Sequence, residues 1–547
     1  MRRWLALGGA VFVALALSGC GPQKAVRAPC PSGKVCLEMG LGAEVNSIDP
    51  NKITGAWEDQ VVGDLMIGLV QSDMNGKPIP GMATRWDVSA DGLKWTFHLR
   101  DAQWSDGAPV TADDFVYSLQ RILKPETASE FAALLYVFKN AEAVNQGKAP
   151  PSAVGVRAIN ARTVEYTLEH PAPYLLELAK HQTMYPVPKH VVEKLGDQWL
   201  RPGNYVSNGP YKLVSWKLGD RIVSDKNPLF WEADQVCIDR VNYYPTEDRI
   251  SGERQVKSGS LDTNTPLNPN RVAFLKTDMP GYVRTAPMLG TTYFAFNTSL
   301  PKFQDKRVRQ ALSMSIDREF ITAKVRNNGE PPAYNFVPPG IANYVPPPPP
   351  AWAAWPYEKR VAEAKRLLAA AGYGPKNPLK FEFTFRGYDP TGMYAAVQAD
   401  WRKMGVEATL IATETQIAYQ QMRIRDFEFG DVAWVADYND AMNFLYLLQS
   451  KTGGMNYSDY NNPTYDALLA QADNERNLVK RAAILQRAEK LMLDDVVVVP
   501  FYSYVSTSVT NPRVTGFASN VDDKHRVRYM CFKDAKPSRA AGPAPKG

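Results

Sequence analysis

The chain has 547 residues, of which 45% are hydrophobic and 22% are charged. This length and composition exclude a disordered or fibrous protein and allow a large core divided among two or three domains. The formal net charge of +6 is small, and the basic residues are spread along the chain, which argues against a nucleic-acid-binding surface.

The first twenty residues have the pattern of an export signal. Arg2 and Arg3 precede an apolar stretch over residues 4–17, which is too short for an ordinary membrane span. The stretch ends in the sequence Leu-Ser-Gly-Cys at Cys20, which resembles the lipobox of bacterial lipoproteins. We therefore expect a signal peptide over residues 1–19 and a diacylglycerol on the Cys20 thiol. An ordinary secretory signal cleaved nearby is the alternative.

Two segments are expected to lie outside the folded body. Residues 20–35 contain several Pro and Gly and predict a flexible tether behind the lipidated cysteine, with folded sequence beginning near Val35. Residues 535–547 are rich in Ala, Pro, Gly, Lys and Arg and predict a disordered tail.

Four further cysteines remain for an oxidising compartment. We expect one or two disulfides, and the sequence leaves three full pairings open. There is no CxxC motif and the five histidines are scattered, which argues against a structural zinc site. The four cysteines are Cys30, Cys36, Cys237 and Cys531.

The body of the chain alternates between strand and helix patterns. Residues 95–100 alternate as in a strand, and residues 111–114 predict the start of a helix that carries Phe115 and Leu119. Such alternation later in the chain predicts βαβ units on a largely parallel sheet. There, helical and strand patterns follow each other over residues 361–371, 379–385, 393–404 and 406–411.

The segment 433–440 ends an apolar, aromatic strand pattern with a carboxylate. An unpaired buried carboxylate is costly, whereas a charge-assisted hydrogen bond to an ammonium is worth about 1.5 to 3 kcal/mol. Asp437 could therefore bind the amine of a ligand. The alternative is a helix N-cap or turn before residues 443–448, and the local pattern leaves both open.

Several segments resemble the extracytoplasmic solute-binding proteins of ABC importers, family 5, and most closely the oligopeptide-binding members. Their order and spacing match across nearly the whole mature chain. The segments are residues 91–117, 208–213, 297–298, 308–318 and 434–440.

The resemblance implies an α/β fold of the type II periplasmic-binding-protein class, cluster C, with two lobes, a hinge and three domains. Lobe I would be assembled from residues 36–56, 181–289 and 505–534. Residues 57–180 would form its accessory domain, and residues 290–504 would form lobe II. An extended peptide would lie between the lobes and hydrogen-bond to strand-like backbone.

The resemblance also assigns residues of lobe II to the ligand. Asp437 matches the carboxylate that pairs with the α-ammonium of the peptide. Trp434 would line a side-chain pocket, with ordinary core packing as its alternative, while Ala433 and Val435 would present backbone. Tyr504 matches a tyrosine near the ligand amine.

Two further groups are carried over with open alternatives. Glu44, Val45 and Asn46 match a lobe I loop that pairs with peptide backbone, although a polar turn explains them equally well. Arg326 matches a basic position that meets the peptide carboxylate, and a solvated charge at a helix end is the alternative.

Three positions depart from the family pattern and leave peptide length and side-chain preference open. Gly290 and Val435 occupy positions that form a disulfide in the nearest type. Asp431 stands in place of a cleft arginine, and Thr415 stands in place of an aromatic pocket wall.

The sequence thus predicts a lipid-anchored, monomeric receptor on the periplasmic or cell-surface side of a bacterial membrane. It would deliver oligopeptides to an ABC permease, without cofactor, metal, nucleic acid or catalysis. Alternatives with the same fold would bind dipeptides, murein peptides, glutathione, nickel chelates or opines, or would have lost the transporter.

One enzymatic alternative is a serine acyl-transferase of the penicillin-binding type. Residues 299–302 fit S-x-x-K and residues 451–453 fit K-T-G. Pro301 and the lack of an S-D-N motif between them argue against it.

Overall fold

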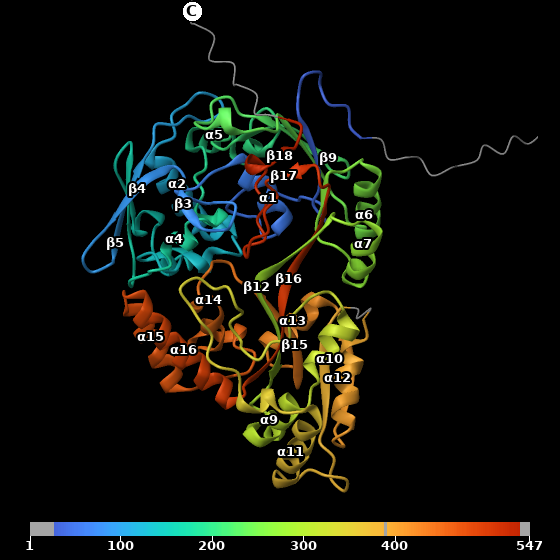
Figure 1. The fold of residues 1–547 in the computed structure, drawn as a ribbon. Helices are drawn as coiled ribbons and strands as arrows, with labels where there is room; N and C mark the ends of the chain where they lie inside the picture. Colours follow the sequence, from blue (N-terminus) through green and yellow to red (C-terminus); the bar gives the residue numbers. More distant parts are fainter. Residues whose placement is uncertain (1–26, 388–390, 536–547) are drawn as a thin grey trace, which may run out of the picture.

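The computed structural model describes residues 27–387 and 391–535. The predicted signal peptide, Cys20 and most of the predicted tail lie outside the described residues. Figure 1 shows two lobes, one above the other, that are joined by the long strands β12 and β16. We call the upper part lobe I and the lower part lobe II.

A single ten-stranded sheet runs through both lobes, with β12 (Val283–Phe296) and β16 (Val498–Thr510) as antiparallel neighbours. Each of these two strands is about 45 Å long at about 3.3 Å per residue, which is enough to enter both lobes. Their register shifts between Pro287 and Thr291, where proline supplies no N–H to the ladder. The sheet order is β14 (Glu407–Thr413), β13 (Lys380–Arg386), β15 (Phe429–Val435), β12, β16, β11 (Thr263–Asn264), β1 (Cys36–Gly40), β10 (Arg240–Tyr244), β9 (Arg221–Lys226) and β8 (Tyr211–Lys217).

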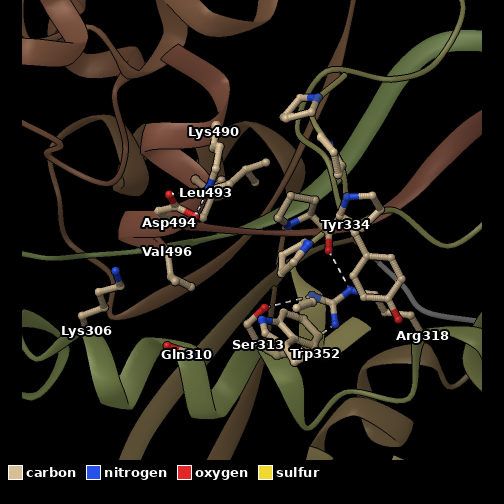
Figure 2. A pocket seen from close by; sticks show the side chains of 17 residues that line it. Lys306, Gln310, Ser313, Arg318, Tyr334, Trp352, Lys490, Leu493, Asp494 and Val496 are labelled. Carbon is tan, nitrogen blue, oxygen red and sulfur yellow. Dashed lines mark hydrogen bonds and ion pairs between the residues drawn. The ribbon is translucent and has the colours of Figure 1, made fainter. Parts of the chain in front are cut away.

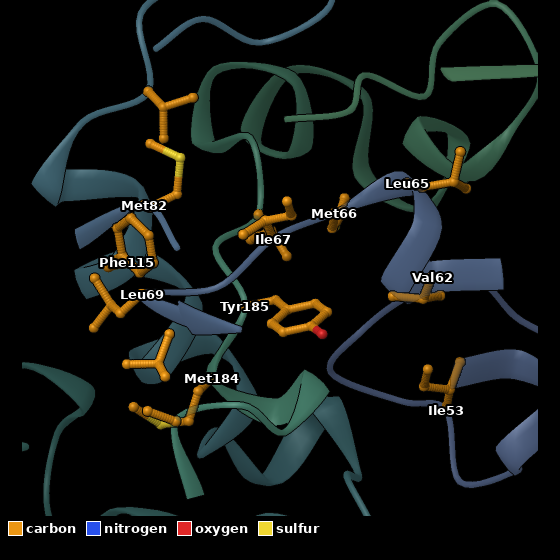
Figure 3. Packing of buried hydrophobic residues seen from close by; sticks show 14 of the residues in the cluster. Ile53, Val62, Leu65, Met66, Ile67, Leu69, Met82, Phe115, Met184 and Tyr185 are labelled. Carbon is orange, nitrogen blue, oxygen red and sulfur yellow. The ribbon is translucent and has the colours of Figure 1, made fainter. Parts of the chain in front are cut away.

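Lobe I is built around one large hydrophobic cluster whose members come from residues 37–243 and 514–532. Figure 3 shows Val62 and Leu65 of helix α1 (Ala56–Leu65) in the same cluster as Met184 and Tyr185. Residues assigned by sequence to the accessory domain and to the lobe I core therefore share one core.

A second, four-stranded antiparallel sheet extends lobe I. Its order is β4 (Ala83–Val88), β5 (Lys94–Leu99), β7 (Thr163–Thr167) and β6 (Val156–Asn160). Helix α2 (Ala112–Ile122) begins where the Thr111 N–H donates to the Asp114 carboxylate at 2.8 Å, and it buries Phe115 and Leu119. The strand and the helix start predicted for this region are confirmed.

Lobe II contains the predicted strand and helix alternation. β13 pairs in parallel with β14 and with β15, and helices α11 (Tyr357–Ala370), α12 (Met393–Arg402) and α13 (Thr415–Arg423) connect or cover them. An aromatic core fills the space beneath these helices, with Phe294, Phe383, Trp401, Phe429 and Phe501 in mutual ring contact. The remaining large helices of this lobe are α9 (Lys306–Met314), α15 (Pro463–Asn474) and α16 (Leu478–Asp495).

Two disulfides select one of the three pairings that the sequence left open. Cys30 bonds to Cys36, and Cys237 bonds to Cys531. The second bond joins the region between β9 and β10 to β18 (Cys531–Phe532), and so fixes the end of the chain to lobe I. The predicted domain boundaries stay a prediction.

The described residues contain no helix that combines the length and the apolar character needed to cross a membrane. Residues 27–35, which the sequence assigns to a flexible tether, contact lobe I through hydrogen bonds and the Cys30–Cys36 disulfide. Residues 346–350 are neither helix nor strand, as the proline run predicts.

A buried ion pair fastens α2 to the segment that follows β1. Arg121 donates to both carboxylate oxygens of Asp49 at 2.9 and 2.6 Å, and to the side-chain oxygen of Asn51 at 2.6 Å. Asp49 is fully buried, and among the described residues Arg121 is the only cation that forms an ion pair with it. The negative charge of Asp49 is therefore balanced by Arg121.

Replacing this arginine should destabilise lobe I. We expect Arg121→Ala to lower the free energy of unfolding by about 3 to 5 kcal/mol, because it leaves the Asp49 charge buried without a partner. Urea unfolding followed by tryptophan fluorescence measures the change. Arg366→Ala, which breaks the exposed pair with Glu363 on α11, should leave the curve unchanged. Equal effects of both substitutions would contradict the assignment.

Candidate ligand-binding site

Asp437 follows β15 near the boundary between the lobes. Its backbone N–H donates to the side-chain oxygen of Asn443 at 3.1 Å, and the Asn443 amide donates to the carboxylate at 3.5 Å. The side chain is partly buried and forms no ion pair with any described residue. Burial raises the pKa of Asp437 to about 6, against the hydrogen bond from Asn443 and the positive charge of Lys524.

The helix-cap alternative for Asp437 does not fit this geometry. Helix α14 (Met442–Leu445) is preceded by Asp440, whose carboxylate accepts from the Met442 N–H at 2.9 Å. Asp440 also forms two hydrogen bonds with Arg481 of α16, at 2.6 and 2.9 Å. Asp440 therefore supplies the cap, and Asp437 is left facing the lobe boundary.

Asn443 is a site residue that the sequence reasoning missed. It is fully buried, and its side-chain oxygen accepts from the Trp434 indole N–H at 2.9 Å as well as from Asp437. One amide thus fixes both the pocket residue and the carboxylate. Trp434 is partly buried and meets the Tyr446 ring edge to face at 6.1 Å. In the sequence, the only signal for the contact between Asp437 and Asn443 is that the two residues lie six positions apart.

The end of β15 has an open edge. On one side Ala433, Trp434 and Val435 pair with Thr292, Thr291 and Gly290 of β12. On the other side β13 pairs only as far as Gly430, and no strand of the described chain continues the ladder. The backbone of Ala433 and Val435 is therefore placed where an extended chain can add as a strand.

Lobe I meets the segment that follows β15 through an aromatic contact. Tyr174, just before α4 (Leu175–Leu178), stacks on Tyr438 with ring centres 5.0 Å apart, and the Arg481 guanidinium lies 5.4 Å from the Tyr174 ring. Figure 1 shows α4 of lobe I opposite α14 of lobe II. Asp437, one residue before Tyr438, consequently lies at the interlobe boundary.

Tyr504 lies beside the same strand end. Gly290 stands opposite Val435, and a Cβ atom on Gly290 would come within 2.7 Å of the Tyr504 ring. Glycine at this position thus gives the tyrosine its space. The two positions that form a disulfide in the nearest family type are neighbours here too, but tyrosine packing replaces the bond.

Arg326 lies deeper in lobe II and is already paired. It donates to both carboxylate oxygens of Glu330 at 2.5 and 2.6 Å, and its guanidinium lies 4.2 Å from the Tyr502 ring. The Tyr502 and Tyr504 rings are 5.7 Å apart, which connects Arg326 to the site through two aromatic side chains.

Asp431 does not face a ligand as a free carboxylate. It is fully buried and accepts from Arg386, at the end of β13, at 2.8 Å. Arg386 also donates to the Tyr419 hydroxyl at 2.7 Å. An arginine is therefore present near the position where the family places one, but it comes from the neighbouring strand.

The predicted loop of lobe I occupies a separate position. The Glu44 carboxylate accepts from the Gly219 N–H at 2.7 Å, Val45 is buried in the lobe I core, and Asn46 is exposed. No hydrogen bond or ion pair within the described ranges joins these residues to Asp437 or Trp434.

The acyl-transferase motif is not assembled. The Ser299 hydroxyl donates to Asn297 at 2.6 Å, whereas the Lys302 ammonium donates to Glu428 at 2.7 Å. Lys302 is therefore bound to a carboxylate and not to the Ser299 hydroxyl, so it does not activate this serine as a nucleophile.

A pocket of about 480 Å³ lies elsewhere on lobe II, between α9, the proline run and α16 (Figure 2). Its arginine, Arg318, donates to the backbone carbonyls of Ser313 and Pro500 at 2.7 and 2.9 Å. None of the residues predicted to bind ligand lines this pocket.

Comparisons with known proteins agree with this architecture. A family model described as bacterial extracellular solute-binding proteins, family 5 Middle, matches residues 77–456. The periplasmic oligopeptide-binding protein OppA of Escherichia coli K12 is 37% identical over 504 residues, which cover 90% of this chain and 92% of OppA. The periplasmic murein peptide-binding protein MppA of the same organism is 38% identical over 503 residues, with coverage of 90% and 93%.

Solved structures give the same result. The murein tripeptide-binding protein MppA of Escherichia coli has a TM-score of 0.78 at 37% identity, covering 92% of this chain and 99% of MppA. Haemophilus influenzae OppA in complex with the peptide RPPGFSPFR has a TM-score of 0.77 at 33% identity, covering 91% and 99%.

These likenesses confirm the predicted fold class, and the relatives are binding proteins rather than enzymes. The chain belongs to family 5 of the bacterial extracellular solute-binding proteins.

Proposed function

We propose that this protein is a lipid-anchored extracytoplasmic receptor that binds oligopeptides between its lobes and delivers them to an ABC permease. The names of OppA and MppA support a peptide ligand. The lipobox-like sequence at Cys20 supports the anchor. The observation that carries the proposal is the partly buried Asp437 carboxylate, which forms no ion pair with a cation of the described residues and whose pKa burial raises to about 6.

The α-ammonium of a peptide would supply that missing cation. Around Asp437, only the amide of Asn443 donates to the carboxylate, at the long distance of 3.5 Å. An ammonium there would form a charge-assisted hydrogen bond and would return the pKa of Asp437 toward its usual range. The free N-terminus is therefore the feature of the ligand that this site recognises most strongly.

The remaining contacts would be to backbone. The open edge of β15 at Ala433 and Val435 can bind an extended peptide as an added strand, with Trp434 lining a side-chain pocket. The Glu44–Asn46 loop would approach the peptide from lobe I. Such contacts read the peptide main chain and tolerate varied side chains.

The basic side of lobe II would receive the peptide carboxylate. Arg326 and Arg386 both interact electrostatically with Tyr504, and each is held in place by one carboxylate, Glu330 or Asp431. Because both charges are paired, their attraction for a ligand carboxylate is weaker than that of a free guanidinium.

A double comparison tests the Asp437 assignment. Asp437→Asn should weaken binding of a free peptide by about 1.5 to 3 kcal/mol, and N-acetylation of the peptide should weaken binding to the unmodified protein equally. Isothermal titration calorimetry measures both.

Combining the Asp437→Asn variant with the acetylated peptide provides the control. The variant should bind free and acetylated peptides alike, because the lost contact cannot be lost twice. Asp494→Asn, on an exposed part of α16, should change neither affinity. If acetylation still weakens binding to Asp437→Asn by the full amount, the peptide amine is bound elsewhere.

Peptide binding should also depend on pH through Asp437. The carboxylate has a pKa of about 6 without ligand, and an ammonium lowers it, so affinity should be full at pH 7 and fall about tenfold by pH 5. The direction follows because protons compete with the ligand for the same oxygen atoms.

The Asp437→Asn variant shows whether this carboxylate causes the pH dependence. Asp437→Asn has no proton to gain at this position, so its calorimetric affinity should stay level between pH 7 and pH 5. A parallel decline in both proteins would assign the pH dependence to another group.

A further inference from the structure

The first described residue is fastened to lobe I by a partly buried ion pair. The two terminal nitrogens of Arg27 donate to the two carboxylate oxygens of Asp262 at 2.8 and 2.7 Å. One of them also donates to the Cys36 carbonyl at 2.9 Å. Asp262 is 2% exposed and Glu38 beside it is fully buried, so Arg27 neutralises an acidic site inside lobe I.

The residues that follow are held as well. Cys30 is bonded to Cys36, the Lys34 N–H donates to the Pro31 carbonyl at 3.0 Å, and the Val35 N–H donates to Asp239 at 3.0 Å. The chain is thus part of lobe I from Arg27 onward. Any free tether behind Cys20 is limited to residues 21–26.

We call the Arg27–Asp262 ion pair the clamp, because it limits the distance between lobe I and the lipid on Cys20. Seven Cα steps separate Cys20 from Arg27, and they span at most about 25 Å when fully extended. A tether free as far as Val35 would reach about 54 Å by the same rule. Arg27 therefore brings one particular face of lobe I to the level of the lipid headgroups.

We call this the tether face, and around the Arg27 site it carries exposed cations from α6 (Arg249–Ser258), α7 (Val272–Asp278) and the loops beside them. The Asn511 N–H donates to the Asp262 carbonyl at 2.8 Å, which brings the segment before Arg513 to this site. Lys257 and Arg513 are paired with the acidic neighbours Asp278 and Asp534. Three exposed cations form no ion pair with any described residue and leave the face with a positive excess: Lys34, Lys276 and Lys533.

Charges interact over only about 10 Å in salt solution. The cations of the tether face can therefore attract lipid headgroups only because the clamp holds this face close to the bilayer.

We propose that the tether face of the lipidated receptor rests on phospholipid headgroups, with lobe II projecting away from the membrane. The proposal rests on the proposed lipidation of Cys20. It commits to a lipid surface as the partner of this face. Figure 1 shows α6 and α7 along one side of lobe I and α11 at the far end of lobe II, so α11 lies farther from the tether face than the interlobe boundary does.

Energy transfer in vesicles tests the pose. The full lipidated chain would be reconstituted in phosphatidylcholine vesicles containing phosphatidylglycerol, with an acceptor dye in the headgroups. A donor dye would be placed at Ser258→Cys on the tether face or at Lys365→Cys on α11, both exposed. We expect transfer from Ser258→Cys to exceed that from Lys365→Cys at least twofold. Equal transfer from both sites would overturn the proposal.

Two kinds of variant test the cause. Arg27→Ala moves the first fixed residue to Cys30 and lengthens the reach to about 36 Å, so transfer from Ser258→Cys should fall by about half. Lys276→Gln combined with Lys533→Gln removes two exposed cations that form no ion pair with a described residue, and should also lower transfer. Arg157→Ala, on the exposed surface of β6, is the matched control and should leave transfer unchanged.

Failure of the anchor and failure of the pose give different results. Intact mass spectrometry of the membrane-extracted protein shows whether Cys20 carries lipid. An unmodified Cys20 would remove the anchor from the proposed function and this inference with it. A lipidated chain that binds peptide but shows equal transfer from both dyes would overturn the pose alone.

Discussion

The proposed site depends on one partly buried carboxylate that forms no ion pair with any described residue. Asp437 receives a single long hydrogen bond from Asn443, and burial raises its pKa to about 6. Holding a carboxylate in this state lowers the stability of the empty protein, because desolvation disfavours its charge. The fold tolerates this cost because Asn443 is fully buried and fixes both Asp437 and Trp434. Under the proposed function, a bound ammonium would remove that cost, so relief of the desolvation penalty would contribute to the free energy of ligand binding.

The sheet explains why such a residue lies between the lobes. β12 and β16 enter both lobes, and β15 pairs with β12 up to Gly290 opposite Val435. The register shift between Pro287 and Thr291 marks the place where β12 passes from one lobe to the other. The end of β15 therefore points at lobe I, where Tyr174 meets Tyr438. Strand pairing alone brings Asp437 to the boundary and leaves one edge of its strand unpaired.

The sequence predicts the parts of this arrangement that depend on local pattern. The strand at 95–100, the helix at 361–371 and the end of β15 follow from the spacing of apolar residues, which is a property of neighbours in the chain. The local pattern leaves Asp437 open as a helix cap or a ligand contact. In the structure Asp440 makes the hydrogen bond to the start of α14 and pairs with Arg481 more than forty residues away, and the ligand role of Asp437 stays a proposal. The Arg386–Asp431 pair and the Cys237–Cys531 bond join distant segments, and no pattern in one sequence specifies such partners.

Charge pairing within lobe II also bears on how selective the receptor is. Arg326, Arg386 and Arg481 are each bonded to a carboxylate of the same lobe. A paired guanidinium has little charge left to distinguish one peptide side chain from another. Asp437 lacks such a partner among the described residues. If peptides bind as proposed, their strongest electrostatic contact would be with the amino end that every unmodified peptide shares. Broad recognition of peptides would then depend on the internal pairing of the lobe II charges as much as on the open edge of β15.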